Sequence, residues 1–315
     1  MIDELVYFNV ARPSMRRVLC YHLALGVLLA LPLLADDTNS IGLDRASAVY
    51  LNNRGDAFRK KGDLENAIKS FTEAIRLDSS FAWPFNNRGL VWEAKRDFAN
   101  AIKDFTEAIR LDPEYSFPFN NRGLVWEAKR DFEKAIKDYT EAIRLDPGYT
   151  FPYNNRGHVW AAKGDFEKAI QDYTEAIRLD PKYTFPLHNR GRVWESKGEF
   201  SKAIEDFTEA TQLDPKFAAP HNAIAWIKAT CHDSRFRGGK KAVQYATKAC
   251  ELTEWKSPAE LDTLAAAYAE AGDFTNAVIW AQTSLEIAPA SEKQRTTERL
   301  NLYRADQPYH QLPKQ

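Results

Sequence analysis

The chain has almost no net charge, because its 43 lysines and arginines are matched by 44 acidic residues over 315 positions. Proteins that read nucleic acids usually present a basic face, and a strong field of either sign is needed to steer charged ligands. The even balance therefore argues against a nucleic-acid partner. Hydrophobic residues make up 44% of the chain, which is enough to build packed cores in a folded protein.

Cysteine and histidine are scarce, with three and six copies. His158, His188, His221 and His232 do not fall at the spacings of zinc ligands, and no glycine-rich phosphate loop, nucleophile elbow or HExxH sequence occurs. The sequence thus predicts no catalytic residue, no metal site and no cofactor, and it argues against an enzyme.

Two of the cysteines, Cys231 and Cys250, are separated by the helical pattern around them. Cys250 lies about 16 Å along a helix that starts near Gly239, whereas a disulfide needs Cα atoms within about 7 Å. We expect free, buried thiols.

Long apolar runs are absent except at residues 18–34, which follow Arg16 and Arg17 and precede Ala35. This layout is typical of a secretory signal peptide, with Met15 as an alternative start. The run also approaches the roughly 18 to 20 residues that cross a bilayer, so an uncleaved anchor stays open. We expect residues 1–35 to be a signal peptide or membrane anchor and 36–47 a polar linker. The protein is then exported: periplasmic, secreted or membrane-tethered.

Most of the remaining chain repeats one unit every 34 residues, and a fixed period of this length is typical of a stacked array. Glycine and alanine mark the same two positions in each unit. The glycines are Gly55, Gly89, Gly123, Gly157 and Gly191, and the alanines are Ala67, Ala101, Ala135, Ala169 and Ala203.

Each unit reads as two short helices, since its apolar residues fall at helical spacing twice, with a break between. An aspartate follows the break and can cap the second helix, as at Asp97, and an Asp-Pro pair such as Asp112-Pro113 ends that helix. In two units Arg96 and Arg130 stand where others have glycine, and we predict a left-handed backbone at these sites.

The order Gly89, Trp92, Ala101, Phe105 and Pro113 resembles the tetratricopeptide repeat. The resemblance covers nearly all of the chain beyond residue 47 and implies an all-α, right-handed superhelical solenoid of helix-turn-helix hairpins. Seven units are expected, at 48–81, 82–115, 116–149, 150–183, 184–217, 218–257 with an insertion in its internal turn, and 258–290. Residues 291–315 are expected to form a capping helix and tail, opened by a capping box of Ser291 and Gln294.

In this family the first helices line a concave groove, which the second, fifth, sixth, ninth, twelfth and thirteenth residues of each unit face. Asparagine dominates the fifth and sixth positions: Asn52 and Asn53, Asn86 and Asn87, Asn120 and Asn121, Asn154 and Asn155, then His188 and Asn189. An amide carries a donor and an acceptor and can pair with an extended peptide backbone. These amides could equally tie down the preceding loop, and both roles stay open.

The ninth and twelfth positions vary most between units, so a selective groove would use them. The candidates are Leu90, Leu124, His158 and Arg192 at the ninth position, and Glu93, Glu127 and Glu195 at the twelfth.

Two sets of aromatic residues recur as well. We expect those at the second position to pack the loop between units rather than stack on a ligand, and those at the eleventh to lie in the core. The second-position residues are Trp83, Phe117, Phe151 and Phe185. The eleventh-position residues are Trp92, Trp126, Trp160 and Trp194.

Five arginines depart from the family pattern, which usually has an aliphatic residue at this place. They are Arg54, Arg88, Arg122, Arg156 and Arg190. We predict that they pair with the glutamates found in the same five units, Glu73, Glu107, Glu141, Glu175 and Glu209. Asp104, Asp138, Asp172 and Asp206 are rival partners, and the pairs can lie within or between units.

The resemblance implies a non-catalytic scaffold that binds an extended peptide or protein segment in the concave groove. The alternatives are a self-assembling structural scaffold that uses the convex face or the ends of the stack, and a regulator of a separately encoded enzyme. The expected partner is a protein or peptide. A membrane is expected to take part only through the N-terminal segment.

Overall fold

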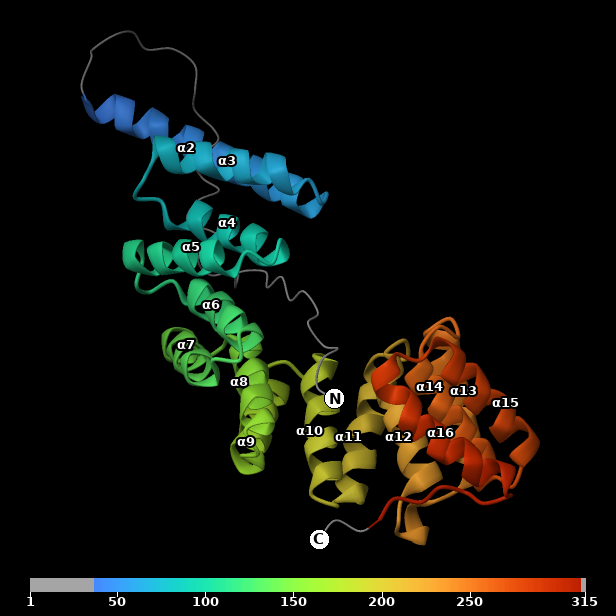
Figure 1. Ribbon diagram of the computed structural model, residues 1–315. Helices are drawn as coiled ribbons and strands as arrows, with labels where there is room; N and C mark the ends of the chain where they lie inside the picture. Colours follow the sequence, from blue (N-terminus) through green and yellow to red (C-terminus); the bar gives the residue numbers. More distant parts are fainter. Residues whose placement is uncertain (1–36, 313–315) are drawn as a thin grey trace. The chain divides into compact units, whose positions relative to one another are not determined.

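The structure is a computed structural model that describes residues 37–312, with side chains from Asp44 onward. The described residues form fifteen α-helices and one short 3-10 helix, with no strand (Figure 1). The chain divides after Ala162 into two compact units, and the signal peptide or anchor expected at residues 1–35 lies outside the described residues. This all-helical array of hairpins confirms the predicted fold class.

The first unit holds three successive helix pairs and the first helix of a fourth. Its helices are α2 (Asp37–Lys60), α3 (Leu64–Leu77), α4 (Ala82–Ala94), α5 (Phe98–Leu111), α6 (Ser116–Ala128), α7 (Phe132–Leu145) and α8 (Thr150–Ala162).

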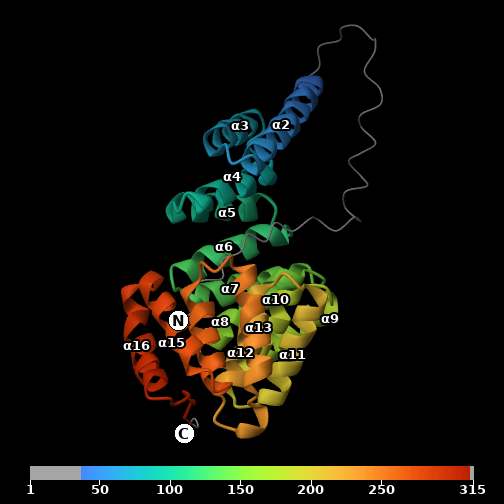
Figure 2. The same cartoon turned by 90° about the vertical axis from the view of Figure 1, so that its right-hand side faces the viewer.

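The second unit continues the alternation and ends on an unpaired helix. Its helices are α9 (Phe166–Leu179), α10 (Thr184–Ser196), α11 (Phe200–Leu213), α12 (Ala218–Thr230), η2 (Ser234–Phe236), α13 (Gly239–Leu252), α14 (Pro258–Glu270), α15 (Phe274–Ile287) and α16 (Ala290–Arg304). The last helix, α16, packs against α15 and buries Leu300 and Tyr303 (Figure 2).

The turns inside the hairpins follow the predicted chemistry. Asp97 accepts a hydrogen bond from the backbone N–H of Asn100 at 3.1 Å, and Asp63, Asp131, Asp165 and Asp273 cap their helices in the same way. Gly62 has a φ of 79°, while Arg96 and Arg130 have φ values of 58° and 61°. The prediction of a left-handed backbone at both arginines is thus confirmed.

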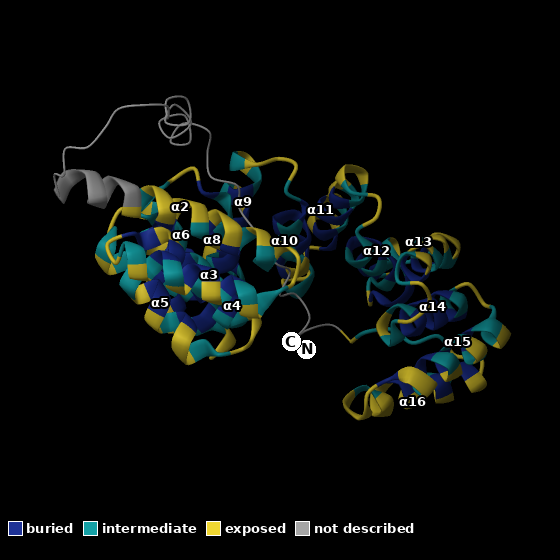
Figure 3. Ribbon diagram, turned by 90° about the horizontal axis from the view of Figure 1, so that it is seen from above, coloured by how far each residue is buried: buried dark blue, intermediate teal, exposed yellow. Residues whose placement is uncertain are grey.

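The two helices of a hairpin cross closely at the repeated glycine. A Cβ atom at Gly89 would lie 2.6 Å from the Phe105 ring, and one at Gly123 would lie 2.6 Å from the Tyr139 ring. Only glycine admits these rings, which are fully buried. In Figure 3 the buried residues accordingly concentrate where neighbouring helices face each other.

Three of the five arginines that depart from the family pattern bind aspartate, and none is shown binding the predicted glutamate, so the predicted glutamate pairing is wrong. Arg88 donates to both carboxylate oxygens of Asp104, at 2.7 and 2.8 Å, and to the Thr72 hydroxyl at 3.0 Å. It therefore joins α4 to its own partner α5 and to α3 of the preceding hairpin. Arg122 and Arg190 repeat the arrangement with Asp138 and Asp206.

The glutamates instead bind arginines one helical turn ahead. Glu107 accepts from Arg110 at 2.7 and 2.9 Å, and Glu73, Glu141 and Glu175 bind Arg76, Arg144 and Arg178 likewise. These contacts lie on the exposed side of the second helices, where such pairs add little stability.

Three further expectations differ from the structure. The first helix begins at Asp37 rather than near Ala48, because no proline interrupts the stretch between them. Helix α16 begins at Ala290 after an extended Pro289, with no side-chain cap, so Ser291 is not a capping residue. The tryptophans expected in the core are only half-buried, and the Lys134 ammonium lies 4.4 Å from the centre of the Trp126 ring.

Cys231 and Cys250 are free and buried, as predicted. Burial raises the pKa of the Cys250 thiol to about 12, so this residue is not a reactive thiolate.

No helix among residues 37–312 is long and apolar enough to cross a membrane.

Candidate functional site

The paired asparagines of the first helices bind one another, and the first member of each pair is buried. In the first unit Asn52, Asn86, Asn120 and Asn154 are between 2 and 7% exposed. Within each pair the fifth residue donates to the sixth: Asn86 Nδ2 lies 3.3 Å from Asn87 Oδ1, and Asn120 Nδ2 lies 3.3 Å from Asn121 Oδ1.

A second set of bonds joins one hairpin to the next. Asn87 donates to Asn52 Oδ1 at 2.9 Å, Asn121 to Asn86 at 3.0 Å, and Asn155 to Asn120 at 3.1 Å. Together the two sets make one continuous run of amide hydrogen bonds, which we call the asparagine chain: Asn154, Asn155, Asn120, Asn121, Asn86, Asn87, Asn52 and Asn53.

The asparagine chain gives these residues a role that sequence reasoning missed. Ligand contact and loop clamping were the two roles left open, whereas the amides tie successive first helices together. The signal was present, because asparagine occurs at adjacent positions in each repeat and each bond between repeats spans 35 residues. In the structure the amide at the sixth position of one repeat donates to the fifth position of the repeat before it.

His188 takes the place of the first asparagine in the fifth repeat. It is 6% exposed and packs against the rings of Phe207 and Phe217, at 5.5 and 5.4 Å. Its Nδ1 has no hydrogen-bond partner among the described residues, and burial lowers its pKa to about 3. This histidine is therefore neutral and acts as an aromatic packing residue.

The aromatic residues at the second position of each repeat pack against aromatic residues in the loops between repeats. Phe117 lies 5.7 Å from Tyr115, the last residue of the repeat before it, and 4.8 Å from Tyr149, the last residue of its own repeat, and Trp83 bridges Phe81 and Tyr115 in the same way. These contacts agree with a role in packing the loops between repeats.

The twelfth-position glutamates have different surroundings in different repeats. Glu127 accepts a hydrogen bond from the Tyr139 hydroxyl at 2.7 Å and contacts His158 Nδ1 at 2.6 Å. The bond to Glu127 raises the pKa of His158 above its usual value. Glu195 pairs with Arg192 at 3.0 Å.

Glu93 lacks partners of this kind. No hydrogen bond or ion pair joins its carboxylate to any side chain in the part of the chain that the structure describes, and burial raises its pKa to about 7. Leu90 and Leu124, two of the predicted groove residues, are half-buried and lie in the same and the next repeat. The described residues contain no group of three or more histidine, cysteine, aspartate or glutamate side chains that could hold a metal ion.

In the last two repeats a segment of the chain itself contacts positions that the family pattern assigns to the groove. The C-terminal tail, residues 305–312, leaves α16 without helix or strand after a short turn and returns to α12. The backbone N–H of Gln311 donates to the Thr230 carbonyl at 2.7 Å, and the ring of Tyr309 lies 6.1 Å from that of Trp226. Trp226 and Thr230 are the ninth and thirteenth residues of α12. The Thr230 carbonyl lies at the C-terminal end of α12, where it has no partner within the helix, so it is free to accept the hydrogen bond from Gln311.

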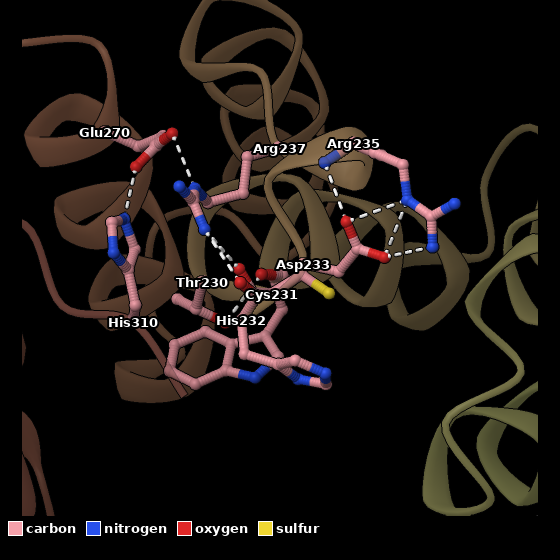
Figure 4. Close-up of polar contacts among 9 residues, drawn as sticks. Thr230, Cys231, His232, Asp233, Arg235, Arg237, Glu270 and His310 are labelled. Atoms are coloured by element: carbon pink, nitrogen blue, oxygen red, sulfur yellow. Dashed lines mark hydrogen bonds and ion pairs between the residues drawn. The ribbon is translucent and has the colours of Figure 1, made fainter. Parts of the chain in front are cut away.

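The carboxylate of Glu270 makes a further contact with the C-terminal tail. Glu270, the thirteenth residue of α14, binds His310 Nε2 of the tail at 2.7 Å and Arg237 at 3.2 Å (Figure 4). Arg237 also donates to the Cys231 and His232 carbonyls, at 2.8 and 3.2 Å, and so fixes the inserted turn of the sixth repeat. Sequence reasoning missed this arrangement, because residues 305–312 carry no periodic pattern.

Sequence profiles of the tetratricopeptide repeat match residues 55–95, 82–115, 118–149, 152–183 and 185–217. No curated protein matches the chain.

Solved structures share the fold at low sequence identity. Yeast Tom70 is 21% identical with a TM-score of 0.53, and the match covers 85% of this chain and 56% of that one. PilF of Pseudomonas aeruginosa is 16% identical with a TM-score of 0.60, covering 67% and 94%. Cut9, in the APC/C hetero-tetramer Cut9-Hcn1, is 17% identical with a TM-score of 0.63, covering 81% and 48%.

The profile matches, the buried crossing of each hairpin at glycine and the fold of these structures agree with one another. The chain belongs to the tetratricopeptide repeat proteins.

Proposed function

We propose that this chain is a non-catalytic scaffold that binds an extended segment of a partner protein along the groove of its first helices. The buried asparagine chain makes the first helices of one unit a continuous surface, and the ninth and twelfth positions present half-buried side chains on it. Such a surface can bind a peptide through its shape and a few polar contacts, and this binding needs no catalytic residue.

The C-terminal tail is the observation that carries this proposal. It is a segment without helix or strand, it lies on groove positions, and it is held by a backbone hydrogen bond, an aromatic contact and a carboxylate. Extended peptides are commonly recognised by such a mixture of main-chain bonds and side-chain anchors. The first helices of the other repeats offer the same positions to a partner.

The test uses the full chain and a random library of peptides of about twelve residues displayed on phage. Hydrogen exchange of the chain is then measured with and without a selected peptide. We expect added protection at the exposed turns after the first helices and at their groove positions. Protection confined to the second helices, or a library that yields no binder, would contradict the groove.

Self-association is a second candidate, favoured by exposed apolar side chains on α15 and in the turn that precedes α14. Ile279 and Ile287 on α15 are each 48% exposed, and Trp255 is 40% exposed and stacks on Trp280 at 5.1 Å. Light scattering over a range of concentrations separates the candidates, because a mass that stays that of one chain excludes self-association. Ile279→Lys with Ile287→Lys should abolish any dimer that forms.

We also propose that the chain is exported, on the pattern of residues 15–37 in the sequence.

A further inference from the structure

Two stretches of the chain, residues 86–98 and 120–132, are identical in sequence, yet their glutamates differ in surroundings. Glu127 is bound by Tyr139, twelve residues ahead, and by His158, thirty-one residues ahead. The residues at the same offsets from Glu93 are Phe105 and Leu124, whose side chains carry no donor. The repeat geometry is otherwise the same, so Glu93 keeps the position of Glu127 without its two partners.

We propose that Glu93 is a binding subsite for a lysine or arginine side chain of the segment held in the groove. The inference rests on the proposed function and names the chemistry of its partner. Leu90, one turn earlier on α4, and Leu124 of the next repeat are half-buried and can flank the alkyl part of such a side chain.

Burial raises the pKa of Glu93 to about 7, so its carboxylate is incompletely charged at neutral pH. No described cation offsets this burial. Lys95, two residues later, binds Glu65 on α3. The pKa of Tyr139 on α7 is raised by burial first and then by the charges of Glu127 and Glu93. An arriving ammonium or guanidinium would supply the missing charge and favour the ionised carboxylate.

The seventh repeat provides an independent precedent within the same chain. There the groove carboxylate of Glu270 is bound by a nitrogen of His310, and His310 belongs to the segment that lies on the groove. A groove glutamate meeting a nitrogen donor from an extended segment is therefore an arrangement that this chain already uses. In the second repeat the segment must come from another molecule or another part of the chain.

The first test repeats the phage selection on the full chain and compares three proteins: the parent, Glu93→Gln and Glu65→Gln. Glu65 is an exposed acid on α3 that binds Lys95, so Glu65→Gln makes the same chemical substitution in a surface ion pair and leaves the Glu93 carboxylate in place. We expect selected peptides to share a lysine or arginine at one position, and Glu93→Gln to weaken their binding at least tenfold. Glu65→Gln should change binding less than twofold.

The second test follows the Glu93 carboxyl by carbon NMR as pH is varied, with and without a selected peptide. We expect the bound peptide to lower the titration midpoint by one unit or more, and the same peptide with its basic residue replaced by norleucine to leave it unchanged.

The outcomes separate the two ideas. Peptides that protect the groove but carry no basic residue, or that bind Glu93→Gln as well as the parent, overturn the subsite and leave the proposed function standing. A library that yields no groove binder overturns both.

Discussion

The arginine that replaces an aliphatic residue in five repeats is only 19% exposed at Arg88, and its aspartate partner is 5% exposed. Breaking such a pair from one side is costly, because the remaining charge stays buried without compensation. The first repeat offers a natural comparison. Sixteen residues after Arg54, at the place of the aspartate, stands Ser70, and its hydroxyl is buried without a hydrogen-bond partner in the described residues.

Replacing Ser70 with aspartate should therefore stabilise the protein. The new carboxylate would receive both nitrogens of Arg54 as Asp104 receives those of Arg88, and we expect the free energy of unfolding to rise by about 1 kcal/mol. Urea unfolding of the full chain measures the change. The double variant Ser70→Asp with Arg54→Ala is the control, since its buried carboxylate has no partner and should make the protein less stable than the parent.

Glu93 makes stability depend on pH in a direction opposite to most carboxylates. Its pKa in the folded chain, about 7, exceeds the value near 4.3 of an unfolded glutamate. Ionisation therefore opposes folding: the penalty is absent below about pH 4, grows as pH rises to 7 and is complete above it.

Glu93→Gln should remove this penalty. We expect the variant to be more stable than the parent by on the order of 2 kcal/mol at pH 8, and by little at pH 4.5. Urea unfolding of both proteins at the two pH values isolates Glu93, because every other titrating group is shared. An equal difference at both pH values would mean that Glu93 titrates normally.

At the scale of the helices, the asparagine chain accounts for a residue choice that works against helix formation. Asparagine costs roughly 0.5 to 0.7 kcal/mol against alanine within a helix, yet it occurs twice in the first helix of each of four repeats. A hydrogen bond contributes roughly 0.5 to 1.5 kcal/mol, and an abandoned buried amide costs more. The bonds between repeats thus outweigh the poor propensity.

Asn86→Ala with Asn120→Ala should lower the melting temperature by several degrees. The pair of changes removes four hydrogen bonds and leaves the side chains of Asn87, Asn121 and Asn155 partly unpaired. Thermal unfolding followed by circular dichroism measures the effect. Asn301→Ala is the control, because Asn301 is exposed on α16 and its replacement tests propensity alone. A melting temperature that rises in both variants would mean that the asparagine chain contributes nothing.

Sequence reasoning reached the helices more readily than the contacts between them. The 34-residue period, the capping aspartates and the turn at Arg96 follow from local rules, and the structure agrees with each. Local rules do not decide whether Asp104 or Glu107 is the partner of Arg88, because both residues lie on α5, three residues apart. The angle between packed helices decides which one the arginine meets, and that angle is set by contacts such as the one between Gly89 and Phe105.

At the scale of the whole chain, the export proposal rests on residues that lie outside the described part. Fusing residues 15–37 to a reporter that is active only outside the cytoplasm should give a signal, and removing residues 1–14 from the full chain should leave its export intact. Replacing Arg16 and Arg17 with glutamate is the control, since a signal peptide needs a positive start. A silent fusion would remove the targeting proposal.

The asparagine chain also bears on how an array of this kind can change its length. The second and third repeats each carry both contacts: the sixth residue donates to the repeat before, and the fifth accepts from the repeat after. The arginine obeys the same rule, reaching one partner in its own hairpin and one behind. Duplication or loss of a whole repeat would therefore leave every asparagine and arginine with its partners in the neighbouring repeat. An insertion of any other length would break both the amide bonds and the arginine contacts between repeats. The contacts that hold the hairpins together thus restrict how the gene can grow, and they favour steps of one complete repeat.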